Sequence, residues 1–254
     1  MNLGLVAKAD SRVAADLAEV FAARGLTVAR LDAARVAATS KGDVPAGPGF
    51  DAVVDCHVVD RGTKTRGLAA LDAALGPETP ILTCCHAATV TSLAAGARHP
   101  ERFVGFGLLP PWSGRTTVEC ARGLATSDAA AEAAAVVWHA AGLEAVWVGD
   151  SAGLVVPRIV ACLANEAAFA LMEGTASPED IDRAMELGTR YPRGPLSWAV
   201  EVGLDHIVAI LDGLSREFDG DRYRAAPLLR GMAIAGGGGM AVARPWPARG
   251  PGGP

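Results

Sequence analysis

The 254-residue sequence lacks an excess of charge of either sign, a long apolar run and an even set of cysteines. Its net charge of −5 is spread over interspersed acids and bases, so we expect no electrostatic binding of nucleic acid. No apolar run reaches the roughly 18 residues that a membrane span requires. The amino terminus has no signal-peptide pattern, and five cysteines without framework spacing indicate reduced thiols. These absences predict a cytoplasmic protein without a membrane or nucleic-acid partner.

Half of the residues are hydrophobic, enough for one large or two modest domains. In the first half, an apolar run at residues 3–7 precedes a helical pattern that Gly25 ends, and a second apolar run follows at 27–31. Strand, helix and strand within about 30 residues form a parallel βαβ unit. Further strands are expected at residues 80–83 and 145–148, with helices at 88–98 and 128–141. This pattern predicts a Rossmann-like α/β domain over residues 1–150.

The second half reads as helical throughout. The first helix, 154–172, is so apolar that we expect it to be buried on most faces. Ser177 and Pro178 form a typical helix start, and a turn with two prolines and a glycine at 192–195 opens another helix. We therefore predict a helical domain over residues 151–235. The remainder, 236–254, is rich in Gly, Pro, Ala and Arg and is predicted to be a flexible tail.

Several of these segments contain sequence motifs that are typical of a known family. The run Tyr-Pro-Arg-Gly-Pro-Leu-Ser-Trp at 191–198, followed by Gly-Leu-Asp at 203–205, resembles the C-terminal domain of L-3-hydroxyacyl-CoA dehydrogenases. It looks most like the branch that handles dicarboxylic acyl-CoAs in aromatic catabolism. Pro-Glu-Arg-Phe at 100–103 and Asn-Glu-Ala at 165–167 also match sequence motifs of this family. The resemblance implies an oxidoreductase that uses NAD on an acyl-CoA and dimerises through its helical domain.

The residues that this resemblance implies for NAD are largely replaced. Counted back from the match in the first helix, the three glycines of the Gly-x-Gly-x-x-Gly turn correspond to Ala9, Ser11 and Ala14, and Asp10 adds a negative charge there. Asp32 stands where an acid accepts the ribose 2′-hydroxyl. NAD is therefore a possible cofactor without its glycine-rich loop, and no cofactor is certain.

The residues implied for catalysis are replaced in the same way. The family's histidine base corresponds to Gly107, whereas its glutamate is kept as Glu119. An asparagine of the next helix has become Pro157. A glutamate without the histidine cannot run the proton transfer, and loss of the base should cost about 10²–10⁴-fold in rate. We therefore expect dehydrogenase activity to be lost or altered. Lys64, which opens a helix in the family pattern, is the second candidate for cofactor binding beside Asp32.

Two groups of cysteine and histidine follow neighbouring strands of the predicted sheet. Cys56 and His57 end one strand, and Cys84, Cys85 and His86 end the other, at the carboxyl edge where open α/β sheets bind ligands. Thiolate and imidazole could form a nucleophile that attacks a thioester or a zinc site. Ordinary buried thiols are the third alternative. Because the spacing matches no standard zinc pattern, we assign no metal and keep Cys84, Cys85 and His86 as catalytic candidates.

Three hypotheses for function follow. The chain is a 3-hydroxyacyl-CoA dehydrogenase-like protein that acts on or binds an acyl thioester; or a non-redox thioester enzyme that uses the Cys/His cluster or Glu119; or an inactive paralogue that partners an active dehydrogenase. The expected partners are an acyl-CoA or related thioester and a second copy of the chain, bound through the helical domain.

Overall fold

The computed structural model of the protein describes residues 1–9, 11–39, 49–110 and 114–236. Asp10, most of the predicted loop at 39–50 and the predicted tail beyond residue 236 lie outside the described residues. Contacts divide the chain into two compact units, residues 1–157 and 158–254. The domain boundary predicted from sequence lies at residue 150, and it stays a prediction; the boundary between the two compact units lies after residue 157.

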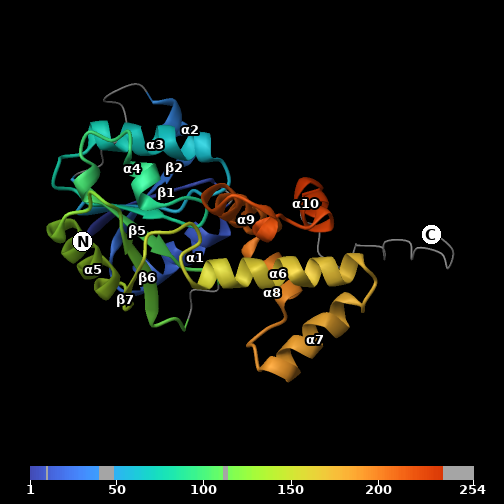
Figure 1. The fold of residues 1–254 in the computed structure, drawn as a ribbon. Coiled ribbons are helices and arrows are strands. Elements are labelled where there is room, and N and C mark those ends of the chain that lie inside the picture. The colour runs from blue at the N-terminus through green and yellow to red at the C-terminus, as the bar shows by residue number, and fades with distance from the viewer. Residues whose placement is uncertain (10, 40–48, 111–113, 237–254) are drawn as a thin grey trace. The chain divides into compact units, whose positions relative to one another are not determined.

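The first unit is a seven-stranded sheet with helices on both faces (Figure 1). The strand order is β2-β1-β3-β4-β5-β6-β7, and the order reverses between β1 and β3. All neighbours pair in parallel except β5 and β6. The strands are β1 Asn2–Ala7, β2 Thr27–Asp32, β3 Ala52–Asp55, β4 Ile81–Cys84, β5 Phe103–Gly107, β6 Thr117–Arg122 and β7 Glu144–Val148.

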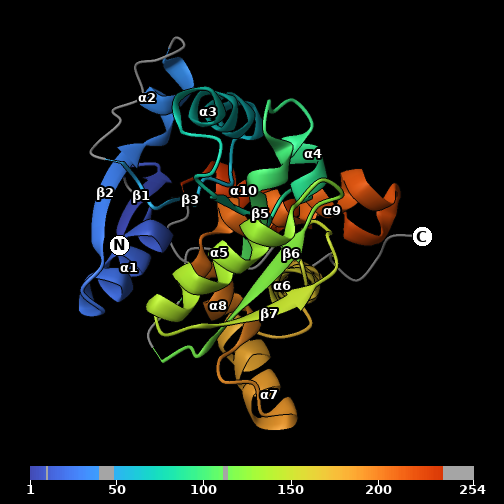
Figure 2. The ribbon, with the colours of Figure 1, turned by 90° about the vertical axis from the view of Figure 1, so that its left-hand side faces the viewer.

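The helices of this unit lie in two layers, with α2, α3 and α4 on one face of the sheet and α1 and α5 on the other (Figure 2). Their bounds are α1 Arg12–Ala23, α2 Ala33–Ala38, α3 Arg61–Ala74, α4 Val90–Ala94 and α5 Asp128–Ala140, with a 3₁₀ turn at Pro100–Arg102. The predicted cap Ser127 is confirmed, because its hydroxyl accepts the N–H of Ala130 at 3.1 Å. The predicted helix 88–98 is wrong in length, since Thr89 caps a helix that ends at Ala94.

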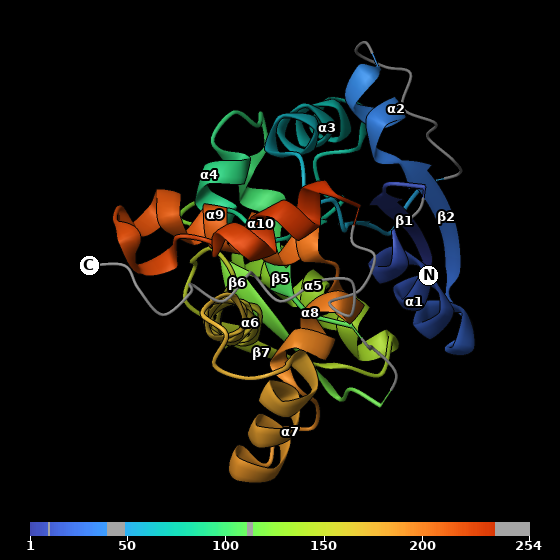
Figure 3. The same ribbon diagram turned by 90° about the vertical axis from the view of Figure 1, so that its right-hand side faces the viewer.

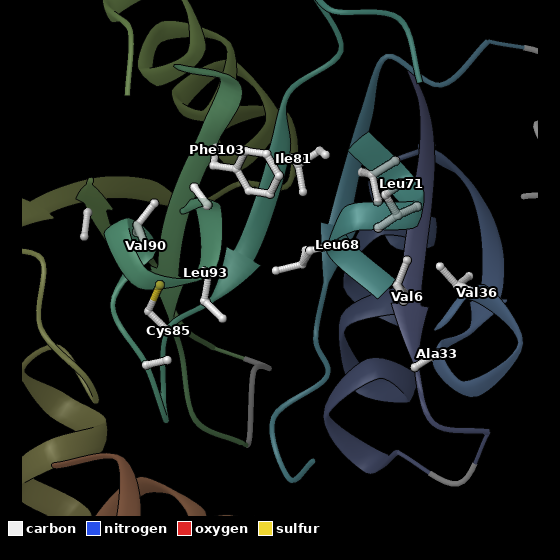
Figure 4. Close-up of a cluster of buried hydrophobic side chains, with 14 of the residues drawn as sticks. Val6, Ala33, Val36, Leu68, Leu71, Ile81, Cys85, Val90, Leu93 and Phe103 are labelled. Carbon is white, nitrogen blue, oxygen red and sulfur yellow. The ribbon is translucent and has the colours of Figure 1, made fainter. Parts of the chain in front are cut away.

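One apolar core fills the face of the sheet beneath α2, α3 and α4 (Figure 4). Leu68 and Leu71 of α3 and Val90 and Leu93 of α4 pack onto side chains of the strands there. Phe103 contributes the largest of these and is fully buried. Burial of this kind contributes roughly 25 cal/mol per Å² of apolar surface, so the core fixes the strand ends from which the candidate site residues project.

The second unit is helical, as predicted, with α6 Val156–Met172, α7 Pro178–Thr189, α8 Pro195–Val202, α9 Leu204–Phe218, a 3₁₀ turn at Asp221–Tyr223 and α10 Pro227–Ile234. Asp182 of α7 explains the Pro-Arg-Gly-Pro-Leu-Ser corner. Its buried carboxylate accepts the backbone N–H groups of Leu196 at 2.8 Å and Ser197 at 2.9 Å, at the start of α8. Gly194 is required beside it, because an added Cβ would lie 2.1 Å from the Asp182 carboxyl carbon.

Two helices of this unit have uncovered apolar surface. Helix α7 extends away from its neighbours (Figure 3), and its only buried residue is Asp182, whereas Leu187 is 71% exposed. In α6, Ile159 is 48% exposed. Along residues 154–172, however, only Val155, Val156, Ile159 and Glu166 are exposed, so this helix is buried on most faces, as predicted. No described helix is both long and apolar enough to cross a bilayer.

Candidate active site

Glu119 and Gly107 lie opposite each other in the antiparallel pair of β5 and β6. Residues in such register have their side chains about 4.5–5.5 Å apart at Cβ. A base at position 107 would therefore stand beside the carboxylate of Glu119. In the family resemblance inferred from sequence, a histidine and a glutamate at these two positions act together. Position 107 has no side chain to act.

The space in front of Gly107 is filled by the segment that leads into α6. A Cβ added at residue 107 would lie 2.8 Å from Leu154 Cδ1 and 3.5 Å from Pro157 Cγ. Leu154 is buried and has a positive φ of 47°, a backbone conformation that is strained for a branched apolar residue. Apolar side chains thus occupy the volume into which an imidazole at this position would extend.

The same segment binds the carboxylate of Glu119. Its two oxygens accept the backbone N–H groups of Val155 at 3.0 Å and Val156 at 2.9 Å. Val156 is the first residue of α6, where N–H groups have no partner within the helix and attract a negative charge. Pro157 follows with no N–H to satisfy. In this arrangement Glu119 is a half-buried capping group of α6.

The cysteines and histidines of the two strand ends do lie on neighbouring strands, as predicted. β3 and β4 pair in parallel up to Asp55 and Thr83, immediately before Cys56 and Cys84. The thiols of Cys56, Cys84 and Cys85 are all buried. Burial raises the pKa of the Cys84 thiol to about 12 and raises the pKa of Cys85 as well. A nucleophilic cysteine requires the opposite shift.

His86 is fully buried at the end of β4. Its Nε2 lies 3.2 Å from the backbone N–H of Leu108, the residue after Gly107, and accepts that hydrogen bond. The Nε2 lone pair is then engaged, which ties the end of β4 to the end of β5. Within the described ranges, no group of three metal-binding side chains occurs.

Lys64 is buried in an ion pair at the base of α3. Its ammonium donates to Asp55 Oδ2 at 2.6 Å and to the backbone oxygen of His57 at 2.7 Å, and Thr83 donates to the same Asp55 oxygen at 2.9 Å. Desolvation is the largest single effect and lowers the pKa of Lys64, but the charge and hydrogen bond of Asp55, together with Cys84 and Cys85, raise the pKa overall. Lys64 is therefore charged and already saturated with strong contacts to β3 and the loop that follows it.

His57 stands beside this ion pair. Burial lowers its pKa, so the ring is neutral at pH 7. Its Nε2 lies 3.1 Å from the backbone oxygen of Asp60 and can donate to it. The polar groups at the end of β3 thus satisfy one another.

The turn between β1 and α1 carries the positions expected for a dinucleotide. Ser11 caps α1, with its hydroxyl accepting the N–H of Ala14 at 3.3 Å, and Ala14 is fully buried. Asp32 ends β2 and caps α2 by accepting the N–H of Arg35 at 2.9 Å. Both side chains therefore have local partners at helix starts. Sequence reasoning did not foresee these caps, although Ser and Asp immediately before a helical pattern are the usual signal for them.

Comparison with known proteins identifies the relatives of this chain. Residues 4–151 match the model of the 3-hydroxyacyl-CoA dehydrogenase NAD binding domain, and residues 153–246 match that of the C-terminal domain. The chain belongs to the 3-hydroxyacyl-CoA dehydrogenase family. The resemblance inferred from sequence is thereby confirmed, as is the α/β class with a Rossmann-like domain followed by helices.

Individual relatives agree with this family. A probable 3-hydroxybutyryl-CoA dehydrogenase of Bacillus subtilis is 34% identical over 186 residues, which cover 73% of this chain but 65% of that protein. The Escherichia coli 3-hydroxyadipyl-CoA dehydrogenase is 38% identical over 107 residues, 42% of this chain and 22% of that one. The crystal structure of (S)-3-hydroxybutyryl-CoA dehydrogenase from Ralstonia eutropha superposes with a TM-score of 0.73 at 30% identity, covering 92% and 94% of the two chains.

Proposed function

We propose that this chain binds or acts on an acyl thioester, and that the NAD-dependent dehydrogenase activity of its family is lost or altered. The observation that carries the proposal is the position opposite Glu119. Oxidation of a 3-hydroxyl by transfer of a hydride from its carbon needs a group that takes the hydroxyl proton. Here that position is Gly107, and its volume is filled by Leu154 and Pro157.

The dinucleotide turn supports the same proposal. A pyrophosphate binds where glycines let the backbone approach it and where N–H groups of a helix start are free. In this chain Ala9 and Ser11 replace the first two glycines, and the Ser11 hydroxyl takes one of those N–H groups. These residues do not fit a dinucleotide in the manner of the glycine-rich turn.

Acyl-thioester binding is proposed from the relatives, which are named for 3-hydroxybutyryl-CoA and 3-hydroxyadipyl-CoA. The test compares this protein with the Ralstonia eutropha enzyme under identical conditions. We expect acetoacetyl-CoA to bind in calorimetry, NADH fluorescence to stay unchanged on titration, and oxidation of 3-hydroxybutyryl-CoA to fall at least about 10²-fold below that enzyme. Hydride transfer at a comparable rate, with NADH bound, would contradict the proposal.

The alternative of a thioester enzyme based on Cys84, Cys85 and His86 has less support. The thiols are buried with raised pKa values, and the His86 Nε2 accepts a backbone hydrogen bond rather than activating a thiol. If Cys84→Ala or Cys85→Ala abolished labelling by an acyl thioester, this alternative would replace the first.

We also propose that the protein forms a homodimer through its helical unit. In support, Leu187 of α7 is 71% exposed and Ile159 of α6 is 48% exposed, and burial of both against a second copy of the chain would remove this apolar surface from water. Sedimentation should give a dimer, and Leu187→Glu should give a monomer. Co-purification with an active dehydrogenase instead would favour the inactive-paralogue hypothesis. A cytoplasmic location remains a prediction from the free cysteines.

A further inference from the structure

Two arginines of the helical unit converge on one aromatic ring. The guanidinium carbon of Arg158, in the first turn of α6, and that of Arg222, in the 3₁₀ turn Asp221–Tyr223, each lie 5.2 Å from the centre of the Tyr223 ring. Arg158 also lies 4.6 Å from the centre of the Phe218 ring and donates a hydrogen bond to the Tyr223 hydroxyl. The two positive charges are therefore within about 10 Å of each other, no farther than one Debye length at 0.1 M salt.

Neither positive charge is neutralised by a carboxylate within the described part of the chain. The ion pairs found there involve other arginines, for example Arg193 with Glu201 and Arg230 with Asp212. Asp221 stands next to Arg222 in sequence and is exposed, but it forms no ion pair with Arg158 or Arg222 in the described residues. Two like charges at this separation without a counter-charge repel each other, and an anion bound near both would remove that cost.

The surroundings hold the two guanidinium groups in place. Tyr223 is buried, 2% exposed, so the ring against which both arginines rest is fixed. Phe218 packs on Tyr223 with ring centres 5.5 Å apart and is 46% exposed, which leaves the cluster open to solvent on one side. Burial raises the pKa of the Cys162 thiol in α6, and the charges of Arg158 and Arg222 both act against this rise. Both arginines therefore lie near Cys162.

We propose that the cluster of Arg158, Arg222, Tyr223 and Phe218 is a binding site for a phosphate group. A guanidinium pairs with phosphate oxygens through parallel N–H donors, and charge-assisted bonds of this kind are the strong ones. Arg158 uses one donor on Tyr223 and is held by stacking, which leaves the rest of its fork for a ligand. The phosphate comes either from free inorganic phosphate or from the phosphates of a coenzyme A thioester.

Calorimetry on the full chain tests this site with inorganic phosphate as the first probe. We expect phosphate to bind, and we expect its affinity to fall as the salt concentration is raised. The substitution Arg222→Gln should lower that affinity about tenfold or more. Arg222 is exposed, so this variant should fold normally. Arg158→Lys keeps the charge but loses the planar fork and should also weaken binding. Arg183→Gln, at an exposed arginine of α7, is the matched control and should bind as the unaltered chain does.

Coenzyme A, dephospho-coenzyme A and pantetheine separate the two sources. If Arg222→Gln weakens coenzyme A but not dephospho-coenzyme A, the site takes the 3′-phosphate of the thioester carrier. If it weakens only inorganic phosphate, the site serves the free anion, and the assignment stands even where thioester binding fails. If phosphate does not bind at millimolar concentration, or binds Arg222→Gln and Arg183→Gln equally, the assignment is overturned.

Discussion

Gly107→His tests directly whether the volume of the lost base has been filled. The new Cβ would lie 2.8 Å from Leu154 Cδ1, closer than real Cβ contacts allow, and the imidazole would extend further into Leu154 and Pro157. Insertion of this much volume into a packed region costs about 1–3 kcal/mol. We expect the variant to lose that much free energy of unfolding and to gain no dehydrogenase activity. Gly96→His, at an exposed glycine with open space around its Cβ position, should change stability by no more than about 0.5 kcal/mol.

A double-mutant cycle with Leu154→Ala identifies the cause. Leu154 is 3% exposed, so its truncation alone should cost about 2–5 kcal/mol. In the double variant the imidazole enters the cavity left by the leucine. The combined loss should therefore be smaller than the sum of the two single losses by at least about 1 kcal/mol. Urea denaturation at 25 °C gives the four values. Additive losses would mean that Leu154 does not fill the position of the base, and the main support for the proposed function would be gone.

Three further predictions concern the site. Glu119→Gln should lower the free energy of unfolding by about 1–2 kcal/mol in urea denaturation, since a neutral amide caps α6 less well, and should leave thioester affinity unchanged; a loss of affinity without a loss of stability would contradict the capping role. Lys64→Met should cost about 3–5 kcal/mol because Asp55 is left buried and unpaired, and Lys64→Met combined with Asp55→Leu should cost less, as thermal unfolding would measure. The pKa of Cys84 is raised to about 12 in the folded chain, above its value in the unfolded chain. The contribution of this thiol to the free energy of unfolding should therefore be constant below about pH 8.5 and fall as the pH rises toward 12, by up to about 1.4 kcal/mol per pH unit. Cys84→Ala should reduce that slope.

The architecture of the first unit could be predicted from periodicity and caps. Apolar runs of four to six residues alternate with helical patterns, and Ser127 precedes its helix with the expected spacing. The neighbourhood of β3 and β4 followed from the family pattern, which is why Cys56 and Cys84 were correctly placed on adjacent strand ends. These features depend on local sequence or on a fixed topology, so no knowledge of side-chain packing was needed.

The contacts of the site could not be predicted in the same way. β6 runs antiparallel to β5, and this reversal is what sets Glu119 opposite Gly107. Sequence reasoning matched both residues to the family but gave no register between them. The capping of α6 by Glu119 and the approach of Leu154 to Gly107 both depend on residues at least 36 positions apart meeting in space. No local pattern specifies such a meeting.

The replacements at the site support one another physically. Once residue 107 has no side chain, Leu154 can move into its volume, and burial of that leucine is favourable. Pro157 is suited to the first turn of α6 because the missing N–H needs no acceptor there. Glu119, without a histidine beside it, accepts the two N–H groups at that helix start. A side chain restored at residue 107 alone would clash with Leu154, so restoration of the base requires at least residues 107 and 154 to change together.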